Sequence, residues 1–154
     1  MQPTSAFAEA TASKPGLREL RGYTGRMSDA ARMGTVSVLG ADVRGPMDHL
    51  EWFPAPAHCT RVRFSSEELS SVCPVTGQPD LSSVVIEYEP SERCIESKSL
   101  KLYLWSFRDR PAFAEALAAE IAVEVQRAAE PRWVKVVLTQ HVRGGIVTEA
   151  TAEL

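Results

Sequence analysis

The sequence predicts an α+β fold, in which an antiparallel sheet carries two helices on one face. Residues 59–64 and 83–89 alternate between apolar and polar side chains, as half-buried strands do. Residues 97–129 contain two helical patterns in succession, and residues 132–151 return to strand patterns around a pair of glycines. This order of strand, strand, helix, helix, strand, strand is typical of one α+β domain, which also suits a chain of 154 residues.

The N-terminal part differs in composition from the rest. Residues 1–33 are rich in small and polar side chains and have few large apolar ones, so we expect a disordered extension. Residues 34–154 are then the single folded domain. Within it, residues 34–57 hold several turn residues between short apolar runs. We expect this segment to be an arm laid on the surface of its own domain or of a neighbouring subunit.

The first two strands are predicted from alternation. In residues 59–64 one face carries Thr60, Val62 and Phe64. In residues 83–89 one face carries Val84, Ile86 and Tyr88, and Pro90 ends the strand.

Two helices follow. Residues 97–107 are mostly large and apolar, which suits a short buried helix with Ser97 as a candidate cap. For residues 112–129 we expect Asp109 as the N-cap and Pro111 close to the first helical position. The apolar stripe of this second helix recurs every four residues, at Phe113, Leu117, Ile121 and Val125.

The last two strands are predicted at residues 132–139 and 146–151, with a turn or bulge at Gly144 and Gly145. Four strands with helices on one side leave two sheet edges. Such edges are usually covered or paired, and closure through subunit contacts into a ring is one solution.

Composition excludes several classes of protein. The formal net charge of -3 gives no basic excess for nucleic acid, and no apolar run is long enough to cross a bilayer. Three widely spaced cysteines form no CxxC pair, and the three histidines have no ligand spacing, so neither a disulfide framework nor a metal site is expected. We expect a cytoplasmic protein with reduced thiols.

The segment of residues 71–80 is the first candidate site. Its two prolines and Gly77 predict a rigid irregular loop. Cys73 and Asp80 would then be held in fixed relation, as nucleophilic catalysis requires. The alternative is a buried structural cysteine beside a turn aspartate, because free cysteines are often buried.

Charged residues mark three further positions. Lys98 and Lys101 share one helical face, and with the exposed amides of a helix start they suit a phosphorylated ligand; a solvated face is the alternative. Arg143 precedes two glycines that let a backbone approach a ligand, although by itself this is a hairpin turn. Glu115, in the first turn of the long helix, either complements the helix dipole or accepts hydrogen bonds from a ligand.

Residues 73–80, 96–107 and 143–145 together resemble the NADPH-dependent 7-cyano-7-deazaguanine reductases, the nitrile reductases of queuosine biosynthesis. The resemblance covers about residues 38–151 and is to the short, single-module subfamily. It implies a tunnelling fold, with protomers in rings and ligand sites between subunits. It also implies the four-electron reduction of a nitrile to a primary amine with two NADPH, and no direct contact with nucleic acid or membrane.

The resemblance also implies roles for individual residues. Cys73 would be the nucleophile that forms a thioimide with the nitrile carbon, and Asp80 the proton donor. The deazaguanine would be recognised by Glu96, Ser97, Phe113 and Glu115. The phosphates of NADPH would be bound by Lys98, Lys101 and Arg143, with Gly144 alongside.

One position departs from the family pattern. The family usually has a histidine before the recognition glutamate, whereas Ala114 precedes Glu115 here. We therefore expect Asp80 to carry more of the proton delivery. Two alternatives stay open: a related amidine-forming transferase of the same fold, which the lysine motif disfavours, and a non-catalytic protein that binds the deazapurine.

Overall fold

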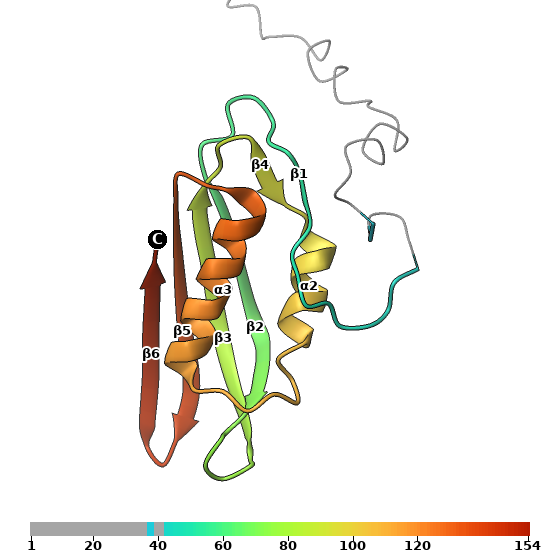
Figure 1. Ribbon diagram of the computed structural model, residues 1–154. Coiled ribbons are helices and arrows are strands. Elements are labelled where there is room, and N and C mark those ends of the chain that lie inside the picture. The colour runs from blue at the N-terminus through green and yellow to red at the C-terminus, as the bar shows by residue number, and fades with distance from the viewer. Residues whose placement is uncertain (1–36, 39–41) are drawn as a thin grey trace, which may run out of the picture.

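The computed structural model describes residues 37–38 and 42–154 of the chain (Figure 1). In this part of the chain the elements are β1 (Trp52–Pro54), β2 (Val62–Val72), β3 (Pro79–Glu89), β4 (Arg93–Ile95), α2 (Ser97–Trp105), α3 (Ala114–Ala129), β5 (Trp133–Arg143) and β6 (Ile146–Glu153). The predicted extension of residues 1–33 lies outside the described residues.

The predicted α+β architecture is confirmed. Four strands form an antiparallel sheet in the order β2-β3-β5-β6, and both helices lie on one face of it (Figure 1). The short strands β1 and β4 were not predicted, and they pair with each other as a second, two-stranded sheet. Strands β2 and β6 are therefore the edges of the larger sheet in the described chain.

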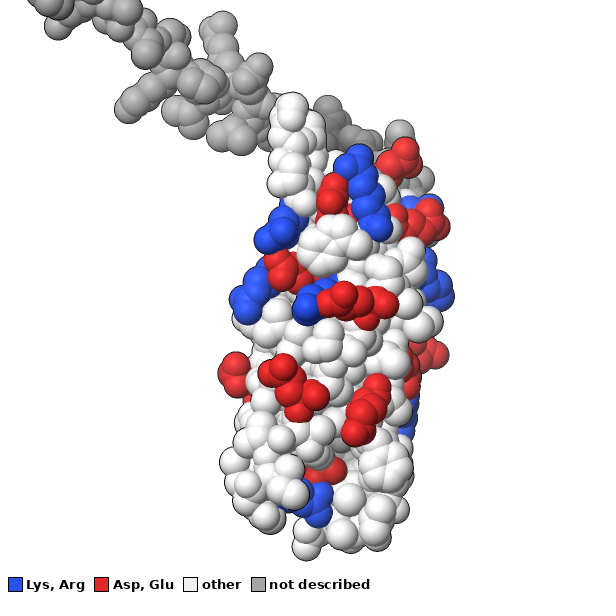
Figure 2. All heavy atoms as spheres, turned by 90° about the vertical axis from the view of Figure 1, so that its left-hand side faces the viewer, with Lys and Arg blue, Asp and Glu red and all other residues white. Residues whose placement is uncertain are grey.

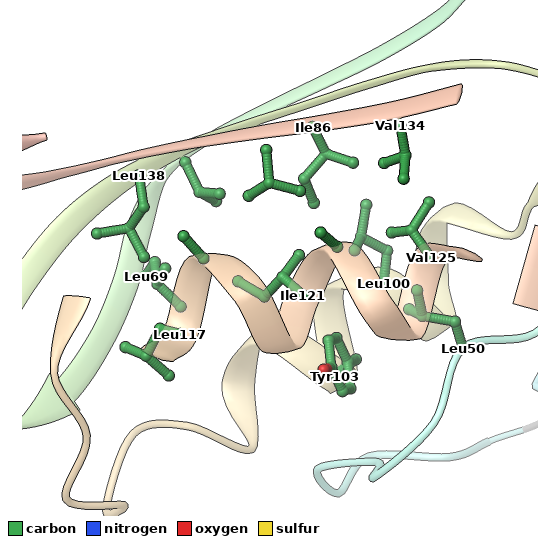
Figure 3. Packing of buried hydrophobic residues seen from close by; sticks show 14 of the residues in the cluster. Leu50, Leu69, Ile86, Leu100, Tyr103, Leu117, Ile121, Val125, Val134 and Leu138 are labelled. Atoms are coloured by element: carbon green, nitrogen blue, oxygen red, sulfur yellow. The ribbon is translucent and has the colours of Figure 1, made fainter. Parts of the chain in front are cut away.

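The core lies between α3 and the sheet. Leu117, Ile121 and Val125 of α3 are fully buried and belong to one hydrophobic cluster (Figure 3). They meet side chains from the helix-covered face of the strands, among them Ile86, Val134 and Leu138. Three of the four predicted stripe positions thus form the core, and the fourth, Phe113, lies outside the helix.

The start of α3 differs from the prediction. The helix begins at Ala114, and its N-cap is Phe113, which makes no side-chain capping bond. Asp109 is not the cap because Pro111 forms a parallel bridge with Val72, which keeps the backbone extended up to Phe113.

Strand β2 is longer than predicted, since it continues from Val62 through the polar residues 65–72. An edge strand with one solvated face tolerates such a composition, which hides it from hydrophobic alternation. The strand β3 begins at Pro79, so Asp80 lies in a strand and not in the loop. Strand β5 also runs further than predicted, to Arg143.

The predicted arm is integrated into the domain where it is described. Leu50 is buried in the core, and Trp52–Pro54 pairs with Arg93–Ile95. Charged side chains of both signs are interspersed on the face shown in Figure 2, without a continuous basic patch on that face. Within the described residues, no helix is long and apolar enough to cross a membrane.

Candidate active site

The connection between β2 and β3 is a tight six-residue loop, residues 73–78, with Cys73 at its start. The Cys73 N–H donates to the Gln78 carbonyl at 2.9 Å, and the Gly77 N–H donates to the Cys73 carbonyl at 2.9 Å. Gly77 has a φ of 68°, in the left-handed region that glycine adopts readily. The predicted irregular loop is confirmed for residues 73–78, whereas residues 71–72 and 79–80 lie in strands.

A β-bulge sets which side chains of β2 face the helices. The register shifts between Ser66 and Leu69, so β2 has one more residue than β3 over this stretch. As a result, Leu69 and Ser71 are on the helix-covered face, and Ser71 lies opposite Asp80. Asp80 is only 4% exposed. Because Cys73 follows Ser71 by two residues, it continues the same face.

A second bulge, in β5, sets the face of the sheet on which Arg143 lies. The register of β5 against β6 shifts between Gln140 and Arg143, which puts both residues on the same face as Ser82 and Asp80. From there the Arg143 guanidinium forms an ion pair with the Asp80 carboxylate. It also donates to the Thr76 hydroxyl at 2.7 Å and to the Gln78 side-chain oxygen at 2.8 Å.

These surroundings favour the thiolate form of Cys73. Hydrogen bonds from the Thr76 hydroxyl, and then from the backbone N–H groups of Thr76 and Val75, lower the pKa of Cys73 to about 7; Arg143 acts in the same direction. By contrast, burial raises the pKa of Cys94 to about 11. Cys73 is half-buried, so a ligand can reach a thiol that is partly ionised near neutral pH.

The segment before α3 brings two further predicted residues to this end of the sheet. The Val72 N–H donates to the Arg110 carbonyl at 3.0 Å, and the Ala112 N–H donates to the Val72 carbonyl at 3.1 Å. Since Val72 precedes Cys73, these bonds hold the start of α3 beside the thiol loop. Phe113 is 58% exposed and Glu115 is exposed, so both are open to a ligand.

Ala114, the position that departs from the expected pattern, is 6% exposed and belongs to the core cluster. Its small side chain packs inward, so position 114 itself presents no ionisable group.

The remaining predicted residues lie at the start of α2. Glu96 is the N-cap in place of Ser97, because its carboxylate accepts from the N–H groups of Lys98 at 2.9 Å and Ser99 at 2.7 Å. The expectation of exposed amides at this helix start is thus wrong for these two groups. The Lys98 ammonium donates to the Val38 carbonyl at 3.1 Å.

The structure does not bring these α2 residues to Cys73 within one chain. The helix α2 has nine residues, a length of about 13 Å. Its start lies near β4, at the opposite end of the sheet from the β2–β3 connection (Figure 1). The predicted residues therefore form two groups: the thiol group of Cys73, Asp80, Phe113, Glu115, Arg143 and Gly144, and the α2 group of Glu96, Ser97, Lys98 and Lys101.

A cavity of about 880 Å³ runs between α2 and the edge strand β2. Ser97 and Lys101 of the α2 group line it, and so do Val72 and Pro79, which flank the thiol loop. Arg108 also lines this cavity and was missed by the sequence analysis. Thr76 and Gln78 were missed as well, although their place between Cys73 and Asp80 was a signal for them.

Comparison with known proteins gives consistent relatives. The family model described as QueF-like protein matches residues 79–154. The NADPH-dependent 7-cyano-7-deazaguanine reductase of Alkalilimnicola ehrlichii is 47% identical over 110 residues, which is 70% of this chain and 85% of that protein. The protein of the same name from an Anaeromyxobacter species is 48% identical over 109 residues, 70% of this chain and 89% of that protein.

A solved structure is also similar. It is the apo form of an archaeosine synthase described as QueF-Like, with a TM-score of 0.58 and 30% sequence identity. The similarity covers 61% of this chain and 92% of that one.

Proposed function

The chain belongs to the family of the NADPH-dependent 7-cyano-7-deazaguanine reductases, and from this premise we propose how its residues carry out the reaction. The protein is an NADPH-dependent nitrile reductase, which converts 7-cyano-7-deazaguanine to 7-aminomethyl-7-deazaguanine in queuosine biosynthesis. The observation that carries the proposal is the arrangement of an ionisable thiol, Cys73, on one face with the buried carboxyl of Asp80.

Cys73 is the nucleophile. Its thiolate adds to the nitrile carbon, so that a C–S bond forms and one π bond of the nitrile breaks. The Asp80 carboxylate takes the proton of the Cys73 thiol and passes it to the nitrogen, which gives a neutral thioimide and leaves Asp80 ionised again. NADPH, when bound, supplies the hydride for the redox chemistry. The chain's own task is to hold the thioimide carbon and the proton donor in place.

Substrate recognition falls to residues from both groups. Glu115 presents an exposed carboxylate that accepts N–H groups of the deazaguanine, and Phe113 offers an exposed ring for its aromatic face. Glu96 and Ser97 contribute from the start of α2. Since the Glu96 carboxylate also caps α2, its contact with the base would use lone pairs that the cap leaves open.

The residues fit a phosphorylated cofactor. Lys101 is exposed and lines the cavity between α2 and β2, whose volume of about 880 Å³ suits part of a dinucleotide. Lys98 lies one helical turn away from it. We assign Lys98, Lys101, Arg143 and the backbone at Gly144 to the binding of NADPH phosphates.

The two groups would meet between subunits. In the described chain the start of α2 lies away from the β2–β3 connection, and the edges β2 and β6 have no neighbouring strand. A homo-oligomeric ring in which edges pair would bring the α2 group of one subunit toward the thiol group of the next. The proposal includes a cytoplasmic location, which the three free thiols support, and no direct nucleic-acid or membrane partner.

The deciding experiment measures NADPH oxidation with 7-cyano-7-deazaguanine and identifies the product by mass spectrometry, with Cys73→Ala as the control. Two NADPH consumed for each amine formed is the expected result. A thioimide on Cys73 without NADPH consumption would instead support an amidine-forming transferase or a binding protein. Because a solved structure similar to this chain is that of an archaeosine synthase, the amidine-forming alternative is also tested. In that assay an amine nucleophile replaces NADPH.

A further inference from the structure

We propose that Arg143 is a positioning residue, which fixes the Asp80 carboxylate and the Cys73 loop in one arrangement and keeps the thiol reactive. This rests on the proposed function and deepens it, because the family resemblance gives Arg143 only a contact with cofactor phosphate. The two roles act at different steps, so they can be separated by experiment.

The contacts of Arg143 join three parts of the site. One guanidinium nitrogen binds the Asp80 carboxylate. The other donates to the Thr76 hydroxyl at 2.7 Å and to the Gln78 side chain at 2.8 Å. The planar fork of a guanidinium suits this division, with one arm for the acid and one for the loop.

The Thr76 hydroxyl links Arg143 to the thiol. It accepts from Arg143, and its hydrogen bond to the thiol is the largest of the effects that lower the pKa of Cys73 to about 7. When Arg143 donates to the hydroxyl oxygen, the hydroxyl proton is directed toward its other partner. Arg143 also lowers the pKa of Cys73 directly, by hydrogen bonding to its side chain.

The bulge in β5 is what makes these contacts possible. Without the extra residue between Gln140 and Arg143, alternation would turn position 143 to the other face of the sheet. Bulges near active sites commonly re-aim a side chain in this way. The bulge in β2 likewise changes the face on which Ser71 and Cys73 lie. Two bulges in separate strands therefore place Cys73 and Arg143 on the same side of the sheet as Asp80.

The charge around the thiol follows from these neighbours. Arg143 from β5 contacts the loop directly, and Asp80 from β3 is joined to the loop through Arg143. The segment packed beside Val72 contributes backbone groups, and its Arg110 is paired with Glu120 on α3. Loss of the Arg143 charge would leave an uncompensated Asp80 carboxylate near Cys73, and a nearby negative charge disfavours the thiolate.

The test measures Cys73 before any cofactor is added. The rate of alkylation by iodoacetamide is followed from about pH 5.5 to 9.5. The rate of thioimide formation with 7-cyano-7-deazaguanine is measured in parallel by mass spectrometry. For Arg143→Gln we expect the alkylation midpoint to rise by about one pH unit, and thioimide formation near pH 7 to slow by about tenfold. Arg143→Lys keeps the charge but loses the fork, so we expect a smaller shift.

A matched control exists on the same two strands. Arg132 precedes β5 and pairs with Glu89 of β3 at 2.6 Å, at the end of the sheet away from Cys73. Arg132→Gln should leave the midpoint unchanged. Thr76→Val removes the hydroxyl that connects Arg143 to the thiol but keeps Arg143, and it should also raise the alkylation midpoint. If Arg143→Gln does not fold, Thr76→Val is the variant that tests the proposal.

An unchanged midpoint in folded Arg143→Gln, with a raised KM for NADPH alone, would overturn the proposal and leave only the phosphate contact. The same holds if Thr76→Val and Arg143→Lys both titrate as the wild type does. Failure of the proposed function looks different: the wild-type chain would form no thioimide, while the shift of the alkylation midpoint in Arg143→Gln would still be observed and would support the positioning role.

Discussion

Pro111 lies beside Val72 in a parallel bridge, so the start of α3 is tied to the residue that precedes Cys73. This tie brings the start of α3, with Phe113 and Glu115, to the Cys73 loop, although these residues are 40 or more positions later in the sequence. The site thus depends on three separate segments of the chain: the β2–β3 loop, the end of β5 and the approach to α3.

The first prediction concerns Glu115. Glu115→Gln should raise KM for 7-cyano-7-deazaguanine by roughly 10- to 100-fold, because a hydrogen bond to a charged group contributes about 1.5–3 kcal/mol. Alkylation of Cys73 should stay unchanged, since the groups that lower its pKa belong to Thr76, Val75 and Arg143. Glu149→Gln, another exposed carboxylate but on β6, is the control. An unaltered KM would remove Glu115 from the recognition set.

The second prediction concerns which thiol reacts. Incubation with the nitrile, without NADPH, should give one adduct, on Cys73. The pKa of Cys73 is lowered to about 7, so its reactivity should rise through neutral pH and level off below pH 9. Burial raises the pKa of Cys94 to about 11, which keeps that thiol protonated throughout. Peptide mapping after the reaction checks this, and an adduct on Cys59 or Cys94 would contradict the assignment.

The order of strands and helices along the chain and most of the core were predictable from the apolar patterns, to which Ile86, Ile121 and Val134 belong. The bulges in β2 and β5 could not be predicted from the sequence. A bulge shifts alternation by one residue, and in polar stretches such as residues 65–72 no apolar pattern records the shift. As a result the sequence suggested that Cys73 and Asp80 belong together but did not indicate that Arg143 joins them.

Helix starts were the other source of error. Ser97 and Asp109 have the residue types that usually cap helices, yet Glu96 and Phe113 hold the N-cap positions. Glu96 is the N-cap because its longer side chain accepts hydrogen bonds from two backbone N–H groups, those of Lys98 and Ser99. Phe113 is at the N-cap because the bridge at Pro111 delays the helix. Tertiary contacts, which the sequence does not display, decided both positions.

The third prediction follows from the cap. Glu96→Ala should lower the free energy of unfolding by about 1 kcal/mol or more, because it leaves the amides of Lys98 and Ser99 without their acceptor. Chemical denaturation measures the change. Glu92→Ala is the control, since Glu92 is exposed and bonds to Ala55 through its backbone carbonyl, which the substitution keeps. A loss of nitrile binding in folded Glu96→Gln would add the recognition role; stability equal to that of wild type in Glu96→Ala would rule out the capping role.

The fourth prediction separates cofactor binding from thioimide formation. Lys101→Ala should raise KM for NADPH, and the effect should shrink at high salt because screening weakens a charge–phosphate contact. Loss of such a contact costs roughly 1.5–3 kcal/mol. The adduct on Cys73 should form at nearly the wild-type rate. Lys135→Ala is the control, because Lys135 pairs with Glu153 on the sheet. If Lys101→Ala abolished the adduct and left KM for NADPH unchanged, Lys101 would not be a cofactor residue.

The fifth prediction concerns proton delivery. Ala114 is buried against the core and offers no proton, so the burden falls on Asp80, which lies on the same face as Cys73. Asp80→Asn should therefore lower kcat by about 10²- to 10⁴-fold, the usual contribution of a general acid. It should change KM for the nitrile much less, because proton transfer acts in the transition state. Asp48→Asn, at an exposed aspartate paired with His49, should behave as the wild type does. Measurement of kcat and KM from about pH 6 to 9 tests this. If Asp80→Asn kept its kcat across that range, another group would have to donate the proton, and His58 and His141 would be the next residues to replace.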